Sequence, residues 1–284
     1  MRLVLLAIGT LLTIMFAVQA ARGGKYKGML VGLDVGDFPL NGLYTVGLAW
    51  SYGKILKFDG KIRDTLVAQA KLLYEPQYAE YYATLVWAQT ITFVHIFMTF
   101  GFLLAGLANF PFLLVALGVF AVVFGYMFMT RMSQELATRK SACVAELPEV
   151  VSTMALLINS GMVLRDAWRT IAYGKDGVIY DLMRDACVNI ENGMSEVEAY
   201  HKFGVLSNCP EVKKFIGSLV QGAEKGGKDL SLFLVAQSSE MWELKKQIML
   251  QKGEAAASKL LMPTALIFVG IMLLVVGGAI GTLL

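Results

Sequence analysis

The longest charge-free stretch of the chain covers residues 81–130, between Glu80 and Arg131. A hydrocarbon core about 30 Å thick takes roughly 20 helical residues, so this stretch is too long for one membrane span and suits two. Near its middle stand Gly106, Asn109 and Pro111, residues that end helices or suit a polar interface. The pattern therefore predicts a hairpin of two spans, residues 81–108 and 109–130.

Two further apolar stretches flank the rest of the chain. Leu3–Ala21 and Leu260–Leu284 also lack charged side chains. With the hairpin they make four predicted transmembrane helices, and the first and last of these cover residues 1–21 and 260–284. The remainder forms two polar blocks, residues 22–80 and 131–259.

The charges indicate which side of the membrane the polar blocks occupy. Of the 25 Lys and Arg residues, 24 lie in the two blocks and the other is Arg2, and all 22 acidic residues also lie in the two blocks. Because Lys and Arg near span ends mark the cytoplasmic side, both blocks are predicted to be cytoplasmic, with the two termini and the hairpin tip outside. The net charge of +3 is small, and its position beside the spans favours contact with the lipid bilayer over nucleic acid.

The first apolar stretch has a second interpretation. Leu3–Phe16, followed by Val18 and Ala20, also resembles the apolar region and cleavage site of a secretory signal peptide. Cleavage would place both blocks outside, so that their Lys and Arg residues would lie on the side of the membrane opposite to the one that such residues usually mark. An uncleaved signal-anchor is preferred, and the question of cleavage stays open.

The polar blocks show helical periodicity. In block 22–80, apolar residues recur at helical spacing over residues 40–48 and again over 66–74, which predicts two short amphipathic helices lying on the membrane or on the larger domain. In block 131–259, stripes such as Val150, Val151, Met154, Leu157 and Ile158 repeat with a period of 3.6 residues. The predicted fold is an all-α membrane protein carrying an antiparallel helical bundle.

Capping residues mark where these helices begin and end. Pro148 and Pro210 suit first-turn positions, and Ser195 with Glu198 forms a capping box. Gly161 is predicted to be a left-handed helix terminus.

A local repeat links two of these helix starts. Residues 161–168 and 193–200 share the frame Gly-Met-x-x-x-acid-Ala-aromatic, with Trp168 and Tyr200 as the aromatic residues. The pattern predicts a glycine turn followed by a helix with a buried ring.

The last helix of block 131–259 carries a coiled-coil-like seam. Its members are Leu230, Leu234, Gln237, Met241, Leu244, Ile248, Gln251 and Ala255. The helix can pack along its own bundle, or the seam can receive a second chain. Trp242 lies beside the seam. A candidate partner interface is formed by Met241, Trp242, Leu244, Lys245 and Lys246.

Five short motifs follow one another in residues 140–284. They are Glu146-Leu147-Pro148-Glu149; Ile158-Asn159-Ser160-Gly161 with Leu164 and Ala167; Ile190-Glu191-Asn192-Gly193 with Glu198-Ala199; Gln221-x-x-Glu224-x-Gly226-Gly227 with Leu230; and Lys252-x-Glu254-Ala255-Ala256-Ala257-Ser258-Lys259-Leu260 before Pro263. In this order and between these spans they resemble the type II secretion F-domain of pilus and secretion platform proteins. The presence of one such domain, not two, favours similarity to the C-type platform protein of the tight-adherence (Tad, Flp-type) pilus.

This resemblance implies a non-enzymatic platform in the bacterial inner membrane. Such a protein would pair with a second platform subunit, as a homo- or hetero-oligomer. It would also engage a cytoplasmic assembly ATPase and act on the transmembrane helices of pilins. The resemblance makes block 131–259 the F-domain. The residues that carry family motifs are Leu147, Pro148, Glu149, Gly161, Gly193, Glu224, Gly226 and Gly227.

The candidate chemistry agrees with a protein that is not an enzyme. The sequence contains no G-x-x-x-x-G-K-[ST], H-E-x-x-H or G-x-S-x-G motif, and we expect no catalytic residue, cofactor or metal. Cys143, Cys187 and Cys209 lie far apart in sequence and are expected to be reduced, buried thiols. His95, inside a predicted span, is expected to be neutral and bonded to a neighbouring helix.

Two other functional classes are alternatives to the platform protein. A polytopic signalling or scaffold protein, whose helical domain binds regulators, is the main alternative. A channel or carrier is disfavoured because the spans contain no acidic residue and show no polar stripe.

Overall fold

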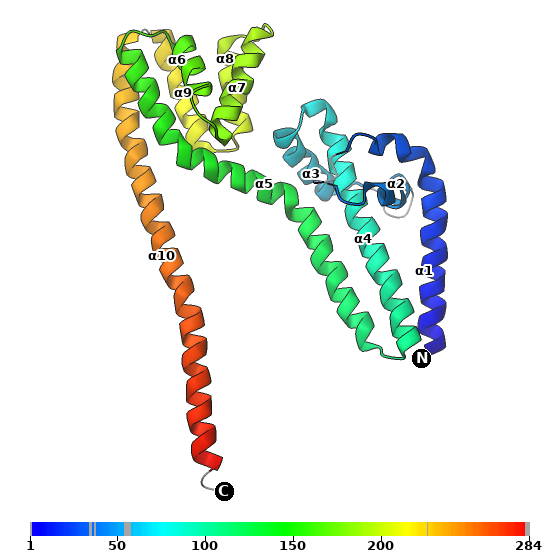
Figure 1. Ribbon diagram of the computed structural model, residues 1–284. Helices are drawn as coiled ribbons and strands as arrows, with labels where there is room; N and C mark the ends of the chain where they lie inside the picture. Colours follow the sequence, from blue (N-terminus) through cyan, green and yellow to red (C-terminus); the bar gives the residue numbers. More distant parts are fainter. Residues whose placement is uncertain (1, 34–35, 37, 54–57, 226, 282–284) are drawn as a thin grey trace. The chain divides into compact units, whose positions relative to one another are not determined.

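The structure is a computed structural model that describes residues 2–33, 36, 38–53, 58–225 and 227–281. No strand occurs in those ranges, which confirms the all-α prediction. The α-helices (Figure 1) are α1 (Arg2–Gly23), α2 (Tyr44–Ser51), α3 (Gly60–Leu73), α4 (Ala79–Ala108), α5 (Phe112–Asn159), α6 (Leu164–Ala172), α7 (Val178–Glu191), α8 (Glu196–Leu206), α9 (Pro210–Lys225) and α10 (Gly227–Gly281). The 3-10 helices are η1 (Gly24–Leu30), η2 (Asn41–Leu43) and η3 (Pro76–Tyr78).

Four helical stretches are long and apolar enough to cross a membrane, as predicted. They are Arg2–Leu30, Pro76–Ala108, Phe112–Asn159 and Leu230–Met272. The chain divides into two compact units between Lys140 and Ser141, and each is described by itself.

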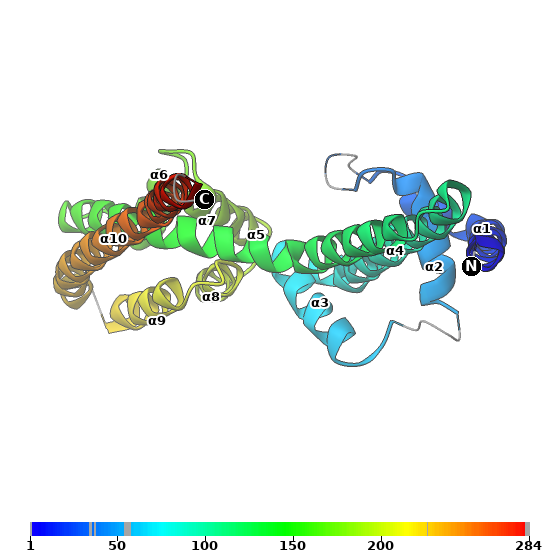
Figure 2. The ribbon, with the colours of Figure 1, turned by 90° about the horizontal axis from the view of Figure 1, so that it is seen from below.

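In the first unit, α2 packs against both α1 and α4 (Figures 1 and 2). Gly47 allows the close approach, because a Cβ there would lie 1.9 Å from the carbonyl oxygen of Ala88. The Gly47 N–H donates to Thr92 Oγ1 at 3.1 Å. α2 therefore differs from the surface amphipathic helix expected at this position. The reason is that nearly every residue of α2 is apolar or small and is buried on all sides.

The second short helix, α3, keeps the expected amphipathic character. Leu66 and Ala70 are buried on one face, and α3 packs on α4. Asp59 caps its N-terminus by accepting a hydrogen bond from Gly60 N–H at 2.8 Å. Arg63 and Glu80 form an ion pair between the two helices.

The polar face of α4 corrects the expectation that the spans lack a polar stripe. Thr84, Thr92, His95 and Thr99 follow one another at helical spacing and are buried. Each of the three threonine hydroxyls donates to the carbonyl oxygen four residues earlier in α4, and Thr92 Oγ1 also accepts the hydrogen bond from Gly47 of α2. This stripe is consequently a packing surface.

His95 is bonded to a neighbouring helix, as the sequence predicts. Its Nε2–H donates to the backbone carbonyl of Leu12 on α1 at 3.1 Å. The imidazole also lies edge-on to Phe16, with ring centroids 5.4 Å apart. The first apolar segment is therefore bonded into the helical packing of this unit.

The second unit is built around the two copies of the Gly-Met repeat. Gly161 and Gly193 have φ angles of 92° and 94°, and in both copies the glycine and methionine N–H groups bond back to the preceding helix as in a Schellman cap. The two aromatic residues meet in the core, where the Trp168 and Tyr200 ring centroids are 4.3 Å apart. Trp168 is only 1% exposed, and its indole N–H donates to the carbonyl of Met183 at 3.2 Å. The repeat therefore produces one joint aromatic cluster.

Two of the other capping predictions are confirmed, and one is wrong. Ser195 Oγ accepts from Glu198 N–H at 3.3 Å, and α9 begins at Pro210. Pro148, however, lies inside α5, which continues from Phe112 through the predicted boundary at residue 131. Packing accounts for this, because Leu147 and Val151, on the two sides of Pro148, are buried in the core and outweigh the local preference of proline for a helix start.

The left-handed conformation at Gly161 leads to a first prediction. A Cβ at Gly161 would contact nothing within 4 Å, and the same holds for Gly217 inside α9. Gly161→Ala should destabilise the protein by about 1–2 kcal/mol through backbone strain, whereas Gly217→Ala should stabilise it by roughly 0.5–1 kcal/mol. Thermal unfolding of the full-length protein in detergent measures both changes. Equal melting temperatures for the two variants would contradict the assigned helix terminus.

Candidate partner-binding face

The candidate interface lies where α10 packs beside the C-terminal part of α5. Ser152 of α5 connects the two helices, because its Oγ lies 2.8 Å from Ser238 Oγ and accepts a hydrogen bond from Trp242 Nε1 at 2.7 Å. Ser231 also donates to the side-chain oxygen of Asn159. These contacts fix α10 along α5 in the antiparallel sense.

The buried seam of α10 ends part of the way along the helix. Leu230, Leu234, Gln237 and Met241 are buried, and Leu244 packs against the same core. From Met249 to Ser258 every residue is exposed, including the seam positions Gln251 and Ala255. The first half of the seam thus packs along its own bundle, as one of the two interpretations expected. Use of the second half by another chain stays a prediction.

A second stripe on α10 is apolar and exposed. It consists of Leu232, Val235, Trp242 and Met249, with exposed fractions of 73%, 51%, 48% and 60%. The spacings of three and seven residues keep these side chains on one face of the helix. Lys245 Nζ lies 4.8 Å from the centroid of the Trp242 ring, so the stripe has basic residues beside an exposed aromatic anchor.

The structure divides the five predicted interface residues into two groups. Met241 is 5% exposed and belongs to the core, with Leu244 half-buried beside it. Trp242, Lys245 and Lys246 retain exposed surface. The accessible part of the predicted interface is therefore the Trp242 side of α10.

The motif residues of α5 hold the bundle together. Leu147 is a core residue at 1% exposure, and Glu149 forms an ion pair with Lys175 in the loop before α7. Pro148 provides the carbonyl that accepts from Ser152 Oγ at 2.7 Å. Through Ser152 this motif is linked directly to Trp242.

Three further motif residues lie near the start of α10 in the sequence. Glu224 is exposed near the end of α9, and Gly227 begins α10. Gly226 lies outside the described residues.

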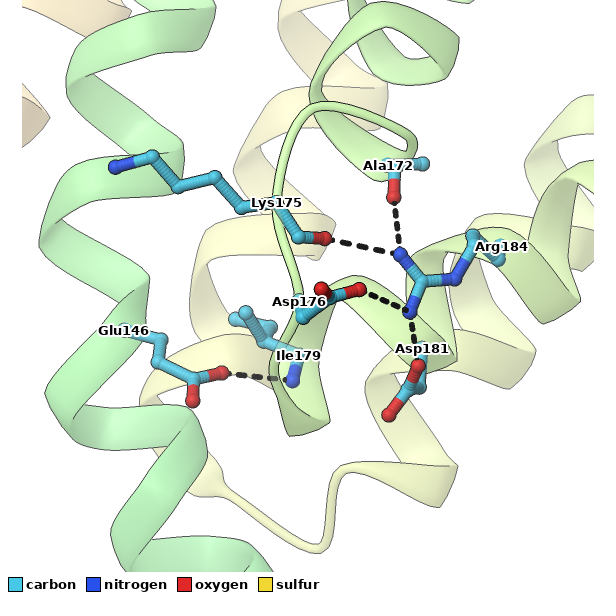
Figure 3. A network of polar contacts seen from close by, with 7 residues as sticks. All are labelled: Glu146, Ala172, Lys175, Asp176, Ile179, Asp181 and Arg184. Atoms are coloured by element: carbon cyan, nitrogen blue, oxygen red, sulfur yellow. Dashed lines mark hydrogen bonds and ion pairs between the residues drawn. The ribbon is translucent and has the colours of Figure 1, made fainter.

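Two residues with structural roles were not identified from the sequence. Glu146, quoted only as part of a motif, accepts a hydrogen bond from the Ile179 N–H at 2.9 Å and so caps α7 from a different helix (Figure 3). Arg184 donates to the carbonyls of Ala172 and Lys175, both at 2.9 Å, which satisfies the end of α6. The one sequence feature that points to such a role is the three-residue spacing between Asp181 and Arg184, which suits an ion pair within a helix, and the two residues form that ion pair.

The three cysteines are buried, as expected, and none belongs to a cluster of His, Cys, Asp and Glu that could hold a metal among the described residues. Burial and the hydrogen bond from the thiol to Glu211 raise the pKa of Cys209 to about 11. Burial also raises the pKa of Cys187. These thiols are poorly accessible and weakly nucleophilic.

These features define a class of protein: a multi-pass α-helical membrane protein with a helical domain between its third and fourth candidate spans. Residues 150–278 match the family described as Type II secretion system (T2SS), protein F. This domain family is associated with the inner-membrane platform proteins of secretion and pilus systems. A search of curated proteins and a search of solved structures found no match.

Adjacent residues on α10 provide a second prediction. Met241→Ala should destabilise the protein by roughly 2–5 kcal/mol, because it leaves a cavity in the core. Trp242→Ala should cost about 1 kcal/mol or less, since the ring is half exposed and loses one hydrogen bond to Ser152. Denaturant unfolding of the full-length protein in detergent compares them. A larger loss for Trp242→Ala would place the core on the other face of α10.

Proposed function

We propose that this protein is an inner-membrane platform subunit of a Tad (Flp-type) pilus or a related secretion system. It couples a cytoplasmic assembly ATPase to the extraction of pilins from the membrane. The match to the type II secretion protein F family and the four span-length helices support this proposal.

The observation that carries the proposal is the continuity of α10. Its 55 residues run as one helix from the helical domain into the last candidate span, and Pro263 does not interrupt it. At 1.5 Å per residue the helix is about 80 Å long. Because α10 is fixed to α5 through Ser152 and Ser238, a displacement of the domain would move the helix with it.

The exposed stripe of α10 is the proposed contact for the ATPase. Tryptophan is among the residues most enriched in interface hot spots, and the lysines beside it can attract an acidic surface of a partner. Trp242 and Lys246 would provide the main contacts, with Leu232 and Val235 covering the apolar area around them. The second platform subunit would occupy the seam beyond Ile248, where the side chains of α10 from Met249 to Ser258 are exposed.

The proposed role needs no catalysis by the platform itself. The sequence has no phosphate-binding loop, and Gly226-Gly227-Lys228-Asp229 lacks both the spacing and the hydroxyl of one. We propose that the energy comes from the partner ATPase and that this chain transmits movement.

The proposed orientation places the helical domain in the cytoplasm, and it can be tested by thiol labelling. The native cysteines are buried and should not react on either side. In intact spheroplasts, a membrane-impermeant maleimide should label Ala108→Cys, in the exposed hairpin, and should label Ser160→Cys only after permeabilisation.

The unmodified protein is the background control in that experiment. Labelling of Ser160→Cys but not Ala108→Cys in intact spheroplasts would show the opposite orientation. That result would also favour cleavage of the first segment.

The function itself predicts the phenotype of a deletion strain. Loss of the gene should abolish surface pili, while processed pilin accumulates in the inner membrane. The double variant Trp242→Ala with Lys246→Glu should remain in the membrane but lose co-purification with the ATPase, because it removes the aromatic anchor and reverses a charge.

A matched control changes the same residue types elsewhere on the domain. Tyr173→Ala with Lys213→Glu alters an exposed ring and an exposed lysine that are not part of α10, and it should leave piliation and co-purification normal. Normal piliation in the deletion strain would reject the platform role and favour the signalling or scaffold alternative.

A further inference from the structure

A pocket of about 450 Å³ lies at the end of α1 in the first unit. Its wall includes Gln19, Arg22, Lys25, Tyr26, Trp50 and Tyr52. The volume is within the range of pockets that bind small molecules. Because Arg22 follows the apolar segment Leu3–Ala21 directly, the pocket is at the depth where a span leaves the hydrocarbon core and meets lipid headgroups.

The described residues that line the pocket include two basic side chains and no acidic one. In the part of the chain that the structure describes, neither Arg22 nor Lys25 forms an ion pair. Lys25 Nζ instead lies 4.9 Å from the centroid of the Tyr26 ring, which stacks on Tyr52 with centroids 5.0 Å apart. The two cations and the stacked rings suit an anionic group at a membrane interface.

One residue that lines the pocket, Trp50, also carries a buried donor without an acceptor. Trp50 is 7% exposed, and its indole N–H has no hydrogen-bond partner. By contrast, the indole N–H groups of Trp168 and Trp242 donate to Met183 and Ser152. A buried N–H without an acceptor is costly, and an oxygen-rich ligand in the pocket would supply the acceptor.

An apolar stripe on α1 leads to this pocket. Leu11, Ile14 and Val18 are exposed to 64%, 61% and 43%, and they lie on the face of α1 that ends at Arg22. An acyl chain can lie along these side chains while its headgroup reaches the basic residues. A soluble phosphate would leave this stripe unused.

We propose that the pocket binds the phosphate headgroup of an anionic glycerophospholipid. The phosphate oxygens accept hydrogen bonds from the Trp50 indole and the Gln19 amide and pair with Arg22 and Lys25, and the acyl chains follow the exposed stripe of α1. The inference requires only that α1 spans the membrane. It is independent of the proposed role in pilus assembly.

Native mass spectrometry of the full-length protein in detergent tests the proposal. Titration with phosphatidylglycerol should give a saturable one-lipid complex, and phosphatidylcholine should bind more weakly. Each basic residue near a membrane surface contributes about fivefold to affinity, so Arg22→Gln with Lys25→Gln should weaken phosphatidylglycerol binding about thirtyfold. Trp50→Phe should also weaken it, although it changes no charge.

Two matched controls separate a built site from general attraction. Lys27→Gln with Lys71→Gln removes the same charge from exposed positions outside the pocket lining, and it should have little effect. Trp87→Phe removes another indole N–H that is buried without a partner, again outside the pocket lining, and should leave lipid binding unchanged. Equal losses for the pocket variants and their controls would overturn the site.

The remaining outcomes concern the identity of the ligand. Inorganic phosphate at equal concentration should not displace phosphatidylglycerol. Displacement by phosphate would identify a soluble anion site and overturn the lipid assignment. Equal binding of phosphatidylglycerol and phosphatidylcholine by the unmodified protein would do the same, and this measurement does not depend on whether any variant folds.

Discussion

The hydrocarbon core of a membrane offers no partner to a backbone N–H or carbonyl group, and the first unit is organised around that constraint. Its long helices satisfy their backbone internally, and the threonine hydroxyls of α4 return to carbonyls of the same helix. Where α2 packs against α4, its Gly47 N–H donates a hydrogen bond to Thr92 Oγ1. His95 likewise finds its acceptor on α1. Polar groups in this unit act mainly as connections between helices.

The helical domain follows a different principle, in which a short sequence unit is used twice. Both Gly-Met turns end one helix with the same cap and start another that carries a buried ring. Because the rings of Trp168 and Tyr200 lie against each other, with centroids 4.3 Å apart, the two copies form a common core. Around this core, Glu146 of α5 bonds to the start of α7, and Arg184 of α7 bonds to the end of α6 (Figure 3).

The helix α10 contains both a part that packs in the helical domain and a part that is long and apolar enough to span a membrane. Its first half belongs to the core of the domain, and its later part has the length and composition of a span. Between them, from Met249 to Ser258, the side chains are exposed. In the proposed function this intermediate part is where a movement produced in the domain would pass toward the membrane, and where a second platform subunit would meet it.

Local signals in the sequence were sufficient for much of the structure. The spans follow from length and hydropathy alone, and the helix ends at Gly161, Ser195 and Pro210 follow from capping preferences within a few residues. The burial of Trp168 and the bond of His95 to another helix were also predictable. Each is a property of one helix or one residue type, and it is determined by residues close together in the sequence.

Only the tertiary structure decided the features that depend on distant neighbours. The helix α5 continues past Pro148, a residue that locally favours a helix start, because the residues on both sides of it pack in the core. Packing on α1 and α4 buries α2, and a hydrogen bond to Ser152 of α5 holds the half-exposed Trp242 ring. The pocket likewise joins Arg22 to Trp50, which a sequence pattern cannot connect. In each case the stabilising contacts join residues that are far apart in the chain. The periodicity of the sequence shows which face of a helix is apolar, but it does not show which element packs on that face.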